Sequence, residues 1–191
     1  MTDVSRCAWA EGKNQQYLDY HDHEWGVPVY DDYKHFEFLI LEGAQAGLSW
    51  STVLAKREGY SKAFDNFDPM KVAIYDEDKM FQLQQNPGII RNQLKIKSAV
   101  NNACQFLKVQ KEVGNFSDYI WSFVNHKQIV NHWTSLAEVP ATSKESDALS
   151  KDLKKRGFSF VGSTVMYAHM QACGLVNDHE TSCFRYHQVN K

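Results

Sequence analysis

Residues 153–174 read LKKRGFSFVGSTVMYAHMQACG, the pattern of two helices joined by a short turn. Gly157 and Gly162 stand at the two ends of that turn. We expect a side chain at either position to crowd a neighbouring backbone, which glycine avoids. The apolar residues between them, Phe158 first, can insert into a core. The second helix begins after Gly162, so its first amide groups point outward and form a natural phosphate site.

Basic residues precede the turn: Lys151, Lys154, Lys155 and Arg156. Together with the turn, they resemble the helix-hairpin-helix element of DNA repair glycosylases, which we place at residues 144–174. The alternative is an ordinary connection between two helices, in which the helix dipole favours basic residues near the first C-terminus. The segment by itself leaves both interpretations open.

The remaining chain is predicted to be mainly α-helical. Asp68 and Ser117 are expected helix caps, and Ser143 with Glu145 close behind it marks another helix start.

No convincing alternating strand pair is present. The polar stretch 140–147 is the best candidate for a loop between two lobes of one domain, 1–191. The helical patterns cover residues 33–50, 49–64, 68–75, 76–85, 89–114, 116–124, 143–157 and 163–174.

Composition indicates a folded globular protein without a global attraction to nucleic acid. Of 191 residues, 43% are hydrophobic, enough for a sizeable core. The net charge of −2 means that any nucleic-acid binding must rest on local patches. Four cysteines do not suggest a disulfide framework. No apolar stretch resembles a signal peptide or approaches 18 residues, so we expect a cytoplasmic protein without membrane contact.

Glu42 lies in the apolar run FLILEGAQAGLSW, where a period of 3.6 residues places it on the face that should be buried. A buried carboxylate must be paired, protonated or part of a site. Aromatic residues nearby suggest a pocket for a flat, polar and possibly cationic ring. The alternative is a partly exposed glutamate at the edge of the apolar stripe, with the aromatics packed in the core. The aromatic candidates are Tyr17, Tyr20, Trp25 and Trp50.

His179 and Cys183 lie four positions apart near the end of the chain, a spacing that suits half of a tetrahedral zinc site. No nearby residue completes such a site. The other two ligands must therefore come from a distant part of the chain, or the spacing is a coincidence.

Nearly the whole chain resembles the 3-methyladenine DNA glycosylase I family. The order and density of the matching motifs carry the resemblance, with Ala8 a small departure where we expect Gly. The matching motifs are RCAW, YLDYHDHEWGVP, LEGAQAGLSW, GIIRNQLKI, WSFVNH, SDALSKDLKKRGFSFVGSTVMYAHMQACGLVNDH and the closing Cys183.

The resemblance implies one structural Zn²⁺ that ties the two ends of the chain together. Closing a loop of 158 residues between His21 and His179 would restrict the unfolded state, and metal binding would add folding free energy. Cys104 and Cys173 are then core thiols. The implied ligands are Cys7, His21, His179 and Cys183.

The resemblance also implies repair of alkylated double-stranded DNA by a monomer that flips out 3-methyladenine, hydrolyses its N-glycosidic bond and releases the free base. Glu42 would accept hydrogen bonds from the base as the catalytic residue. Trp50 and Tyr20 would sandwich or wall the base, and Tyr17 and Trp25 would complete the pocket. The implied DNA-binding residues are Gly157, Phe158, Gly162, Ser163 and Thr164.

Relatives that also cut the DNA strand carry a lysine just after the second hairpin glycine, where this chain has Ser163 and Thr164. We therefore expect a monofunctional enzyme that leaves an abasic site. Asp178 is interpreted as a structural residue or a support for the metal ligands. Two other classes remain open: a zinc-stapled DNA-binding module without catalysis, and a small-molecule binder or hydrolase that uses the pocket without DNA.

Overall fold

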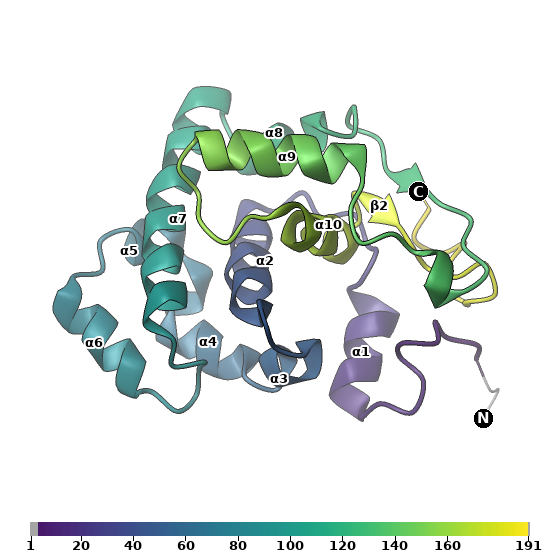
Figure 1. Cartoon of the computed structure of the whole chain (residues 1–191), viewed down its shortest axis with the longest axis horizontal. Coiled ribbons are helices and arrows are strands. Elements are labelled where there is room, and N and C mark those ends of the chain that lie inside the picture. The colour runs from purple at the N-terminus through teal and green to yellow at the C-terminus, as the bar shows by residue number, and fades with distance from the viewer. Residues whose placement is uncertain (1–3, 191) are drawn as a thin grey trace.

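Helices dominate the computed structural model, which describes residues 4–190 (Figure 1). None of its helices combines the length and apolar character that a membrane span requires. The α-helices are α1 (Gln15–His23), α2 (Asp32–Gln45), α3 (Trp50–Leu54), α4 (Arg57–Ala63), α5 (Pro69–Val72), α6 (Glu77–Gln85), α7 (Gln93–Val113), α8 (Phe116–Ser122), α9 (Lys144–Lys155) and α10 (Ser163–Ala172). Short 3-10 turns occupy Asp65–Phe67 (η1) and Leu136–Glu138 (η2).

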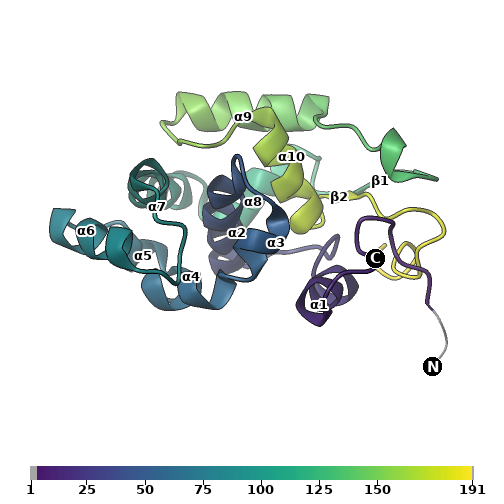
Figure 2. The same cartoon turned by 60° about the horizontal axis from the view of Figure 1, so that its bottom comes forward.

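Helix α2 forms the centre of the fold and is enclosed by α7, α8 and α10 (Figures 1 and 2). Every residue from His35 to Ala44 is buried. A helix that is buried on all sides must be apolar on all sides or carry special polar residues. Glu37 on this helix is paired with Lys34 and Arg57, whereas the polar side chains of His35 and Glu42 need a physical explanation.

His35 has a partner within the core. Its Nδ1 lies 3.2 Å from Nε2 of the buried His169 on α10. Burial lowers the pKa of His35 to about 4, so the imidazole is neutral at physiological pH. A neutral imidazole can donate a hydrogen bond through one nitrogen and accept one through the other. The two histidines therefore cross-link α2 and α10 without a buried charge.

Helix starts agree with the sequence in two of three places. Asp68 caps α5 by accepting hydrogen bonds from Met70 N and Lys71 N. Ser143 caps α9 and forms a reciprocal capping box with Ser146. The prediction for α8 was wrong, because Asn115 caps that helix and Ser117 lies inside it.

The chain also contains a short strand pair that the sequence analysis did not predict. Strand β1 (Ile129–Val130) pairs in parallel with β2 (Val176–Asn177), with Ile129 opposite Val176. Two residues per strand are too few to show an alternating pattern, and parallel partners lie far apart in sequence. The pair fixes the segment that leads from α10 into the C-terminal loop.

Residues of α7 hold the hairpin between α9 and α10. Asn101 donates from Nδ2 to Gly157 O at 2.8 Å. The Asn102 amide both donates to Ser159 O at 2.9 Å and accepts from Ser159 N at 2.8 Å. These contacts satisfy loop groups that would otherwise be left unpaired near the core.

The two hairpin glycines differ in their roles, and crowding explains neither. Gly157 adopts φ +90°, a conformation that glycine accepts readily. A Cβ built on it would come no closer than 3.5 Å to Gln105. Gly162 has an ordinary φ of −60°, and a Cβ there would meet no atom of residues 4–190 within 4 Å. The fold of the chain therefore does not itself require glycine at position 162.

Candidate active site and metal centre

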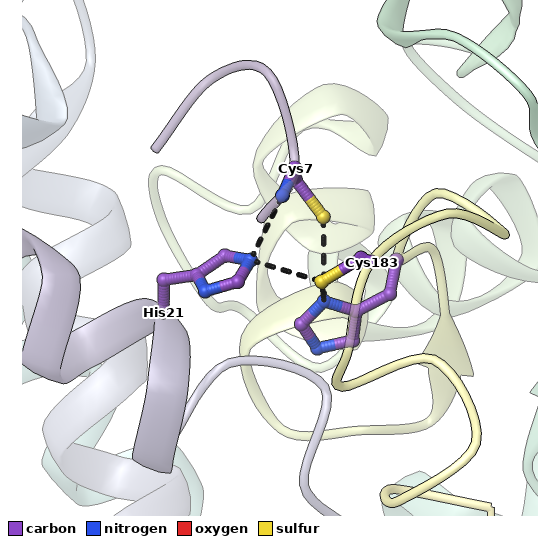
Figure 3. A group of neighbouring side chains, drawn as sticks. Cys7, His21 and Cys183 are labelled. Atoms are coloured by element: carbon purple, nitrogen blue, oxygen red, sulfur yellow. Dashed lines mark hydrogen bonds between the residues drawn. The ribbon is translucent and has the colours of Figure 1, made fainter. Parts of the chain in front are cut away.

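Two cysteines and two histidines from the two ends of the chain meet in the core. Figure 3 shows Cys7, from the N-terminal segment, directed toward His21 on α1 and Cys183 in the C-terminal loop. His179 joins them, and one ligand atom from each residue lies within 4.8 Å of all the others. All four residues are buried. The structure therefore brings together every residue predicted as a metal ligand.

The spacing of these atoms fits a tetrahedral ion. Cys183 Sγ lies 3.6 Å from His21 Nε2 and 3.5 Å from His179 Nδ1. Cys7 Sγ lies 3.4 Å from His179 Nδ1. A zinc ion with ordinary bond lengths holds its sulfur and nitrogen ligands about 3.5 Å apart. The donor set and its geometry therefore match Zn²⁺.

Hydrogen bonds orient both imidazoles of the cluster. His21 Nδ1 lies 2.7 Å from Asp22 Oδ1, and Arg6 donates hydrogen bonds from Nε and Nη2 to the same carboxylate. His179 Nε2 lies 3.0 Å from Trp25 O. Each of these contacts leaves the other ring nitrogen of its histidine free to face the cluster. Such support is typical of metal-ligating histidines.

A cavity of about 210 Å³ is lined by residues of α1, α2, α3 and α10 together with loop residues. It contains all five residues predicted from sequence for the base pocket: Tyr17, Tyr20, Trp25, Glu42 and Trp50. Sequence reasoning did not place the remaining lining residues in the pocket: Trp9, Gln45, Leu136, Val139, Ala168, Gln171, Asp178 and Glu180. A signal was present for three of them, because Trp9 follows Cys7 closely and Asp178 and Glu180 flank His179.

The aromatic rings form adjoining walls of the cavity. The Tyr20 and Trp50 ring centroids lie 5.2 Å apart with the planes inclined at 47°. A base between two rings needs them parallel and about 7 Å apart, twice the contact distance of carbon atoms. The geometry therefore favours the wall arrangement over the sandwich. The Trp50 indole N–H is buried and has no hydrogen-bond partner within residues 4–190, and a buried unpaired donor of this kind is rare in folded proteins.

Glu42 is only 4% exposed, and no donor within residues 4–190 forms a hydrogen bond to its carboxyl group. Burial raises its pKa to about 8, so the group is largely protonated at neutral pH when the cavity is free. A cation in the cavity would favour the ionised form. Glu42, Asp178 and Glu180 all line the cavity, whereas no Lys, Arg or His of the described chain does. The lining therefore favours a positively charged guest.

The shifted pKa predicts a pH-dependent gain of stability in the Glu42→Gln variant. A folded pKa above the ordinary 4.5 means that the carboxyl group stabilises the fold below pH 4.5 and loses that contribution as pH rises to about 8. The advantage of the Gln variant in unfolding free energy should therefore grow by roughly 3–5 kcal/mol over this range. Urea denaturation of both proteins at pH 5 and pH 8.5 measures it.

Glu58→Gln is the matched control, because Glu58 is exposed on α4. Its difference from the wild type should show no comparable rise over the same range. A Glu42→Gln difference that stays constant with pH would contradict the placement of an unpaired carboxyl group in the core.

Asp178 is buried and accepts four hydrogen bonds. Its Oδ1 receives Asn131 Nδ2 at 2.7 Å and Trp133 Nε1 at 2.8 Å. Its Oδ2 receives the Tyr167 hydroxyl at 2.7 Å and Gln171 Nε2 at 2.8 Å. A carboxylate offers about four lone-pair sites, and all are occupied here. The structure thus agrees with a structural interpretation of Asp178, since little capacity remains to take a proton from a substrate.

Helix α10 links the cavity to the hairpin. Its first residues include Thr164, which is exposed, and Ser163, whose hydroxyl donates to Asp147 Oδ1 at 2.5 Å. Ala168 and Gln171, further along the same helix, line the cavity. Phe158 is buried, so only its backbone could face DNA.

The basic cluster before the hairpin is smaller than the sequence suggested. Arg156 pairs with Glu112 and Asp152, which neutralises part of its charge. Lys151, Lys154 and Lys155 are exposed on α9. These three lysines therefore provide the local positive charge on this side of the hairpin.

Comparison with known proteins gives one consistent result. The chain is 51% identical over 183 residues to DNA-3-methyladenine glycosylase 1 of Escherichia coli (strain K12), covering 96% of this chain and 97% of that protein. It is 52% identical over 180 residues to DNA-3-methyladenine glycosylase of Haemophilus influenzae, covering 94% and 97%. A structure of 3-methyladenine DNA glycosylase I from Staphylococcus aureus, solved to explain recognition of 3-methyladenine, superposes with a TM-score of 0.91 at 37% identity, covering 95% and 96%.

The family assignment rests on most of the chain. The sequence model described as methyladenine glycosylase matches residues 9–186, which include every cavity residue and three of the four clustered metal-ligand candidates. The chain therefore belongs to the methyladenine glycosylase family, and it is a glycosylase, an enzyme that hydrolyses N-glycosyl bonds.

Proposed function

We propose that this enzyme flips 3-methyladenine out of alkylated double-stranded DNA and hydrolyses its N-glycosidic bond, leaving an abasic site. The observation that carries this proposal is the aromatic cavity with three carboxyl groups and, among the described residues, no basic side chain. The related Staphylococcus aureus protein recognises 3-methyladenine, and its structure is closely similar. An enzyme acting on a base must take it out of the stack, and this cavity offers an enclosed place for it.

The chemistry requires little of the protein. Methylation at N3 makes the adenine a cation, so breaking the bond between N9 and C1′ returns the electron pair to the ring and neutralises it. Water then supplies the hydroxyl group on C1′ and releases its remaining proton to the solvent. Glu42 stabilises the positive charge as it passes from the base to the sugar, in a site that excludes solvent, where a charge interaction is stronger than in water. Unmodified adenine is neutral and a poor leaving group, so selectivity is largely chemical.

We further propose that the enzyme has no lyase activity. Strand cleavage by related enzymes needs an amine that forms a Schiff base with the sugar. Ser163 and Thr164 occupy the positions after Gly162, and no lysine of the described chain lines the cavity. The product is therefore an intact strand with an abasic site.

We assign one structural Zn²⁺ per chain to Cys7, His21, His179 and Cys183. Supporting this assignment are the buried two-sulfur, two-nitrogen donor set and its tetrahedral spacing. The ion would supply cross-linking rather than catalysis, because four protein ligands leave no open position. The chain's own residues already connect these segments, as Phe184 N donates to Ser5 O at 2.9 Å and Ala8 N to Glu180 Oε1 at 2.8 Å.

The hairpin is proposed to hold the DNA backbone. The first amide groups of α10 are available to a phosphate, and the space in front of Gly162 is open. Because the fold does not require glycine there, the approach of a ligand explains its presence. In this proposal the enzyme acts on DNA as a cytoplasmic monomer.

Gly162→Asp should weaken binding to any duplex by about tenfold or more, since a negative side chain would meet the phosphate. Phosphate contacts carry no sequence information, so damaged and undamaged DNA should lose affinity equally. Fluorescence anisotropy with both duplexes measures the loss. Affinity for free 3-methyladenine should remain at the wild-type value, because the cavity is untouched. Unchanged duplex affinity in the folded variant would mean that the hairpin is only a structural turn.

A base-release assay on methylated duplex DNA tests the proposed function directly. The wild type should release 3-methyladenine and leave alkali-sensitive abasic sites in unbroken strands. A protein that binds the duplex without releasing base would support the zinc-stapled DNA-binding module, which the enzyme assignment already disfavours. Hydrolysis of free nucleosides without activity on DNA would support the small-molecule hydrolase.

A further inference from the structure

Gln171 is a polar cavity residue whose orientation is fixed. Its Nε2 donates to Asp178 Oδ2 at 2.8 Å. A carboxylate can only accept, so the amide nitrogen of Gln171 must face Asp178. Its carbonyl oxygen, Oε1, has no hydrogen-bond partner within residues 4–190 and is not sealed from solvent. Gln171 lines the cavity, and with its amide nitrogen held by Asp178 this oxygen is the polar atom of the side chain that remains for a ligand there.

The other partners of Asp178 prevent the pair from reversing. Trp133 Nε1 is only a donor, and together with Asn131 Nδ2 it occupies Oδ1. The Tyr167 hydroxyl shares Oδ2 with Gln171. With four donors around it, the carboxylate cannot take the acceptor end of the Gln171 amide. The cavity thus presents two acceptors, the Glu42 carboxyl group and Gln171 Oε1.

A base that carries an amino group fits two acceptors, whereas a base that carries an oxo group does not. Adenine has an exocyclic amino group at C6, and its two hydrogens are the strongest donors on the base. Guanine has an oxygen at the same position. N3-methylated forms of both are cations with good leaving groups, so chemical lability does not distinguish them. Discrimination between them must come from the cavity, through the group at C6 and through the amino group that only guanine carries at C2.

We propose that Gln171 is a specificity-determining residue, whose carbonyl oxygen accepts a hydrogen bond from the C6 amino group of the flipped base and rejects a C6 oxygen. Asp178 is the positioning residue that holds this acceptor toward the cavity. The proposal rests on the proposed excision of 3-methyladenine and adds the basis of selection against 3-methylguanine. A site that hydrogen-bonds a substrate group rejects an analogue that leaves the site's own polar atom unpaired.

Two variants test the two roles separately. Gln171→Met keeps the length and removes the acceptor, so the preference for 3-methyladenine over 3-methylguanine should fall by about tenfold, the value of one neutral hydrogen bond. Asp178→Asn should reduce it further. The oxygen of the new amide must stay toward Trp133, which only donates, so its nitrogen faces Gln171. Gln171 then turns over and presents its own NH₂ group to the cavity.

The measurement is the ratio of the two bases released from one sample of methylated duplex DNA, quantified together by mass spectrometry. This ratio does not depend on the fraction of folded enzyme, so a destabilised variant still gives an answer. Gln128→Met is the matched control. It removes the hydrogen bonds from Gln128 to Gly26 O and Gly174 O near the same elements, but Gln128 does not line the cavity, so the ratio should not change.

The possible results distinguish a failure of the Gln171 assignment from a failure of the proposed function. A wild type that releases no 3-methyladenine would overturn the proposed function. A wild type that prefers 3-methyladenine, with the same preference in Gln171→Met and Asp178→Asn, would overturn the role of Gln171 alone. An equal shift in Gln128→Met would show that loosened packing causes the change, and this too would overturn the assignment.

Discussion

Replacing Glu42 by Gln is expected to slow release of 3-methyladenine from methylated DNA by about one to three orders of magnitude, the scale of losing one electrostatic contact in a dry site. The amide keeps the shape of the side chain and one acceptor but cannot become an anion. The loss should appear in single-turnover excision at saturating enzyme, where binding no longer limits the rate. Trp50, Tyr20 and the other walls remain in place, so the fold should be retained.

The pH dependence of base binding distinguishes lost charge from lost shape. Because burial raises the pKa of Glu42 to about 8 in the free cavity, binding of a fixed cation must ionise the group. Affinity of the wild type for DNA carrying the cationic lesion should therefore rise with pH and level off above about 8. The Gln variant should show a flat profile over that range. An excision rate equal to that of the wild type would remove Glu42 from the reaction, even though the family assignment would stand.

Cys183→Ser is expected to reduce the free energy of unfolding by several kcal/mol, because a structural metal contributes its binding energy to folding. The cluster would lose one of four ligands, and the C-terminal loop would lose its Cys183 contact with His21 on α1. Trp9 and Trp25 pack edge-on against the imidazoles of His21 and His179, so the cavity walls should loosen as well. Thermal melting, together with elemental analysis of chelator-free protein, measures both losses.

Cys104→Ser provides the comparison for this variant. Cys104 is a half-buried thiol on α7 that lies outside the cluster and contacts Ala73 O at 3.5 Å. Its replacement should retain one zinc per chain and lower the melting temperature only slightly. A wild type without zinc, or a Cys183→Ser protein that melts with the wild type, would contradict the metal assignment.

The part of the site that could be predicted from sequence is the part with a local signal. Glu42 was identifiable because a carboxyl group in an apolar helix breaks the helical pattern, and Tyr17, Tyr20 and Trp25 lie close together in the chain. Cys7 and His21 had no such signal, because their partners lie more than 150 residues away. Only the resemblance to a family pointed to them.

The remaining cavity residues could not be predicted, because their roles depend on partners that the fold supplies. Gln171 is an ordinary helical residue until Asp178 fixes its amide, and Asp178 is explained only by four donors from two separate segments. The β1–β2 pair could not be predicted for the same reason, because each strand depends on a partner that only the fold brings close. For Gly162, the fold supplies no reason for the residue type. Its backbone angles and the open space around it would accept a side chain, so only a ligand explains the glycine.

Helix α10 carries the proposed phosphate contact at Gly162 and the proposed base contact at Gln171. Nine positions of helix separate them (171 − 162), an axial distance of about 14 Å. The His35–His169 contact fixes this rod to the central helix α2. The two ends of α10 cannot move independently. The protein therefore holds the DNA phosphate and the flipped base at one fixed distance from each other. The DNA, rather than the protein, must therefore deform to bring a damaged nucleotide to that distance. The local stiffness of the DNA then contributes to which sites the enzyme recognises.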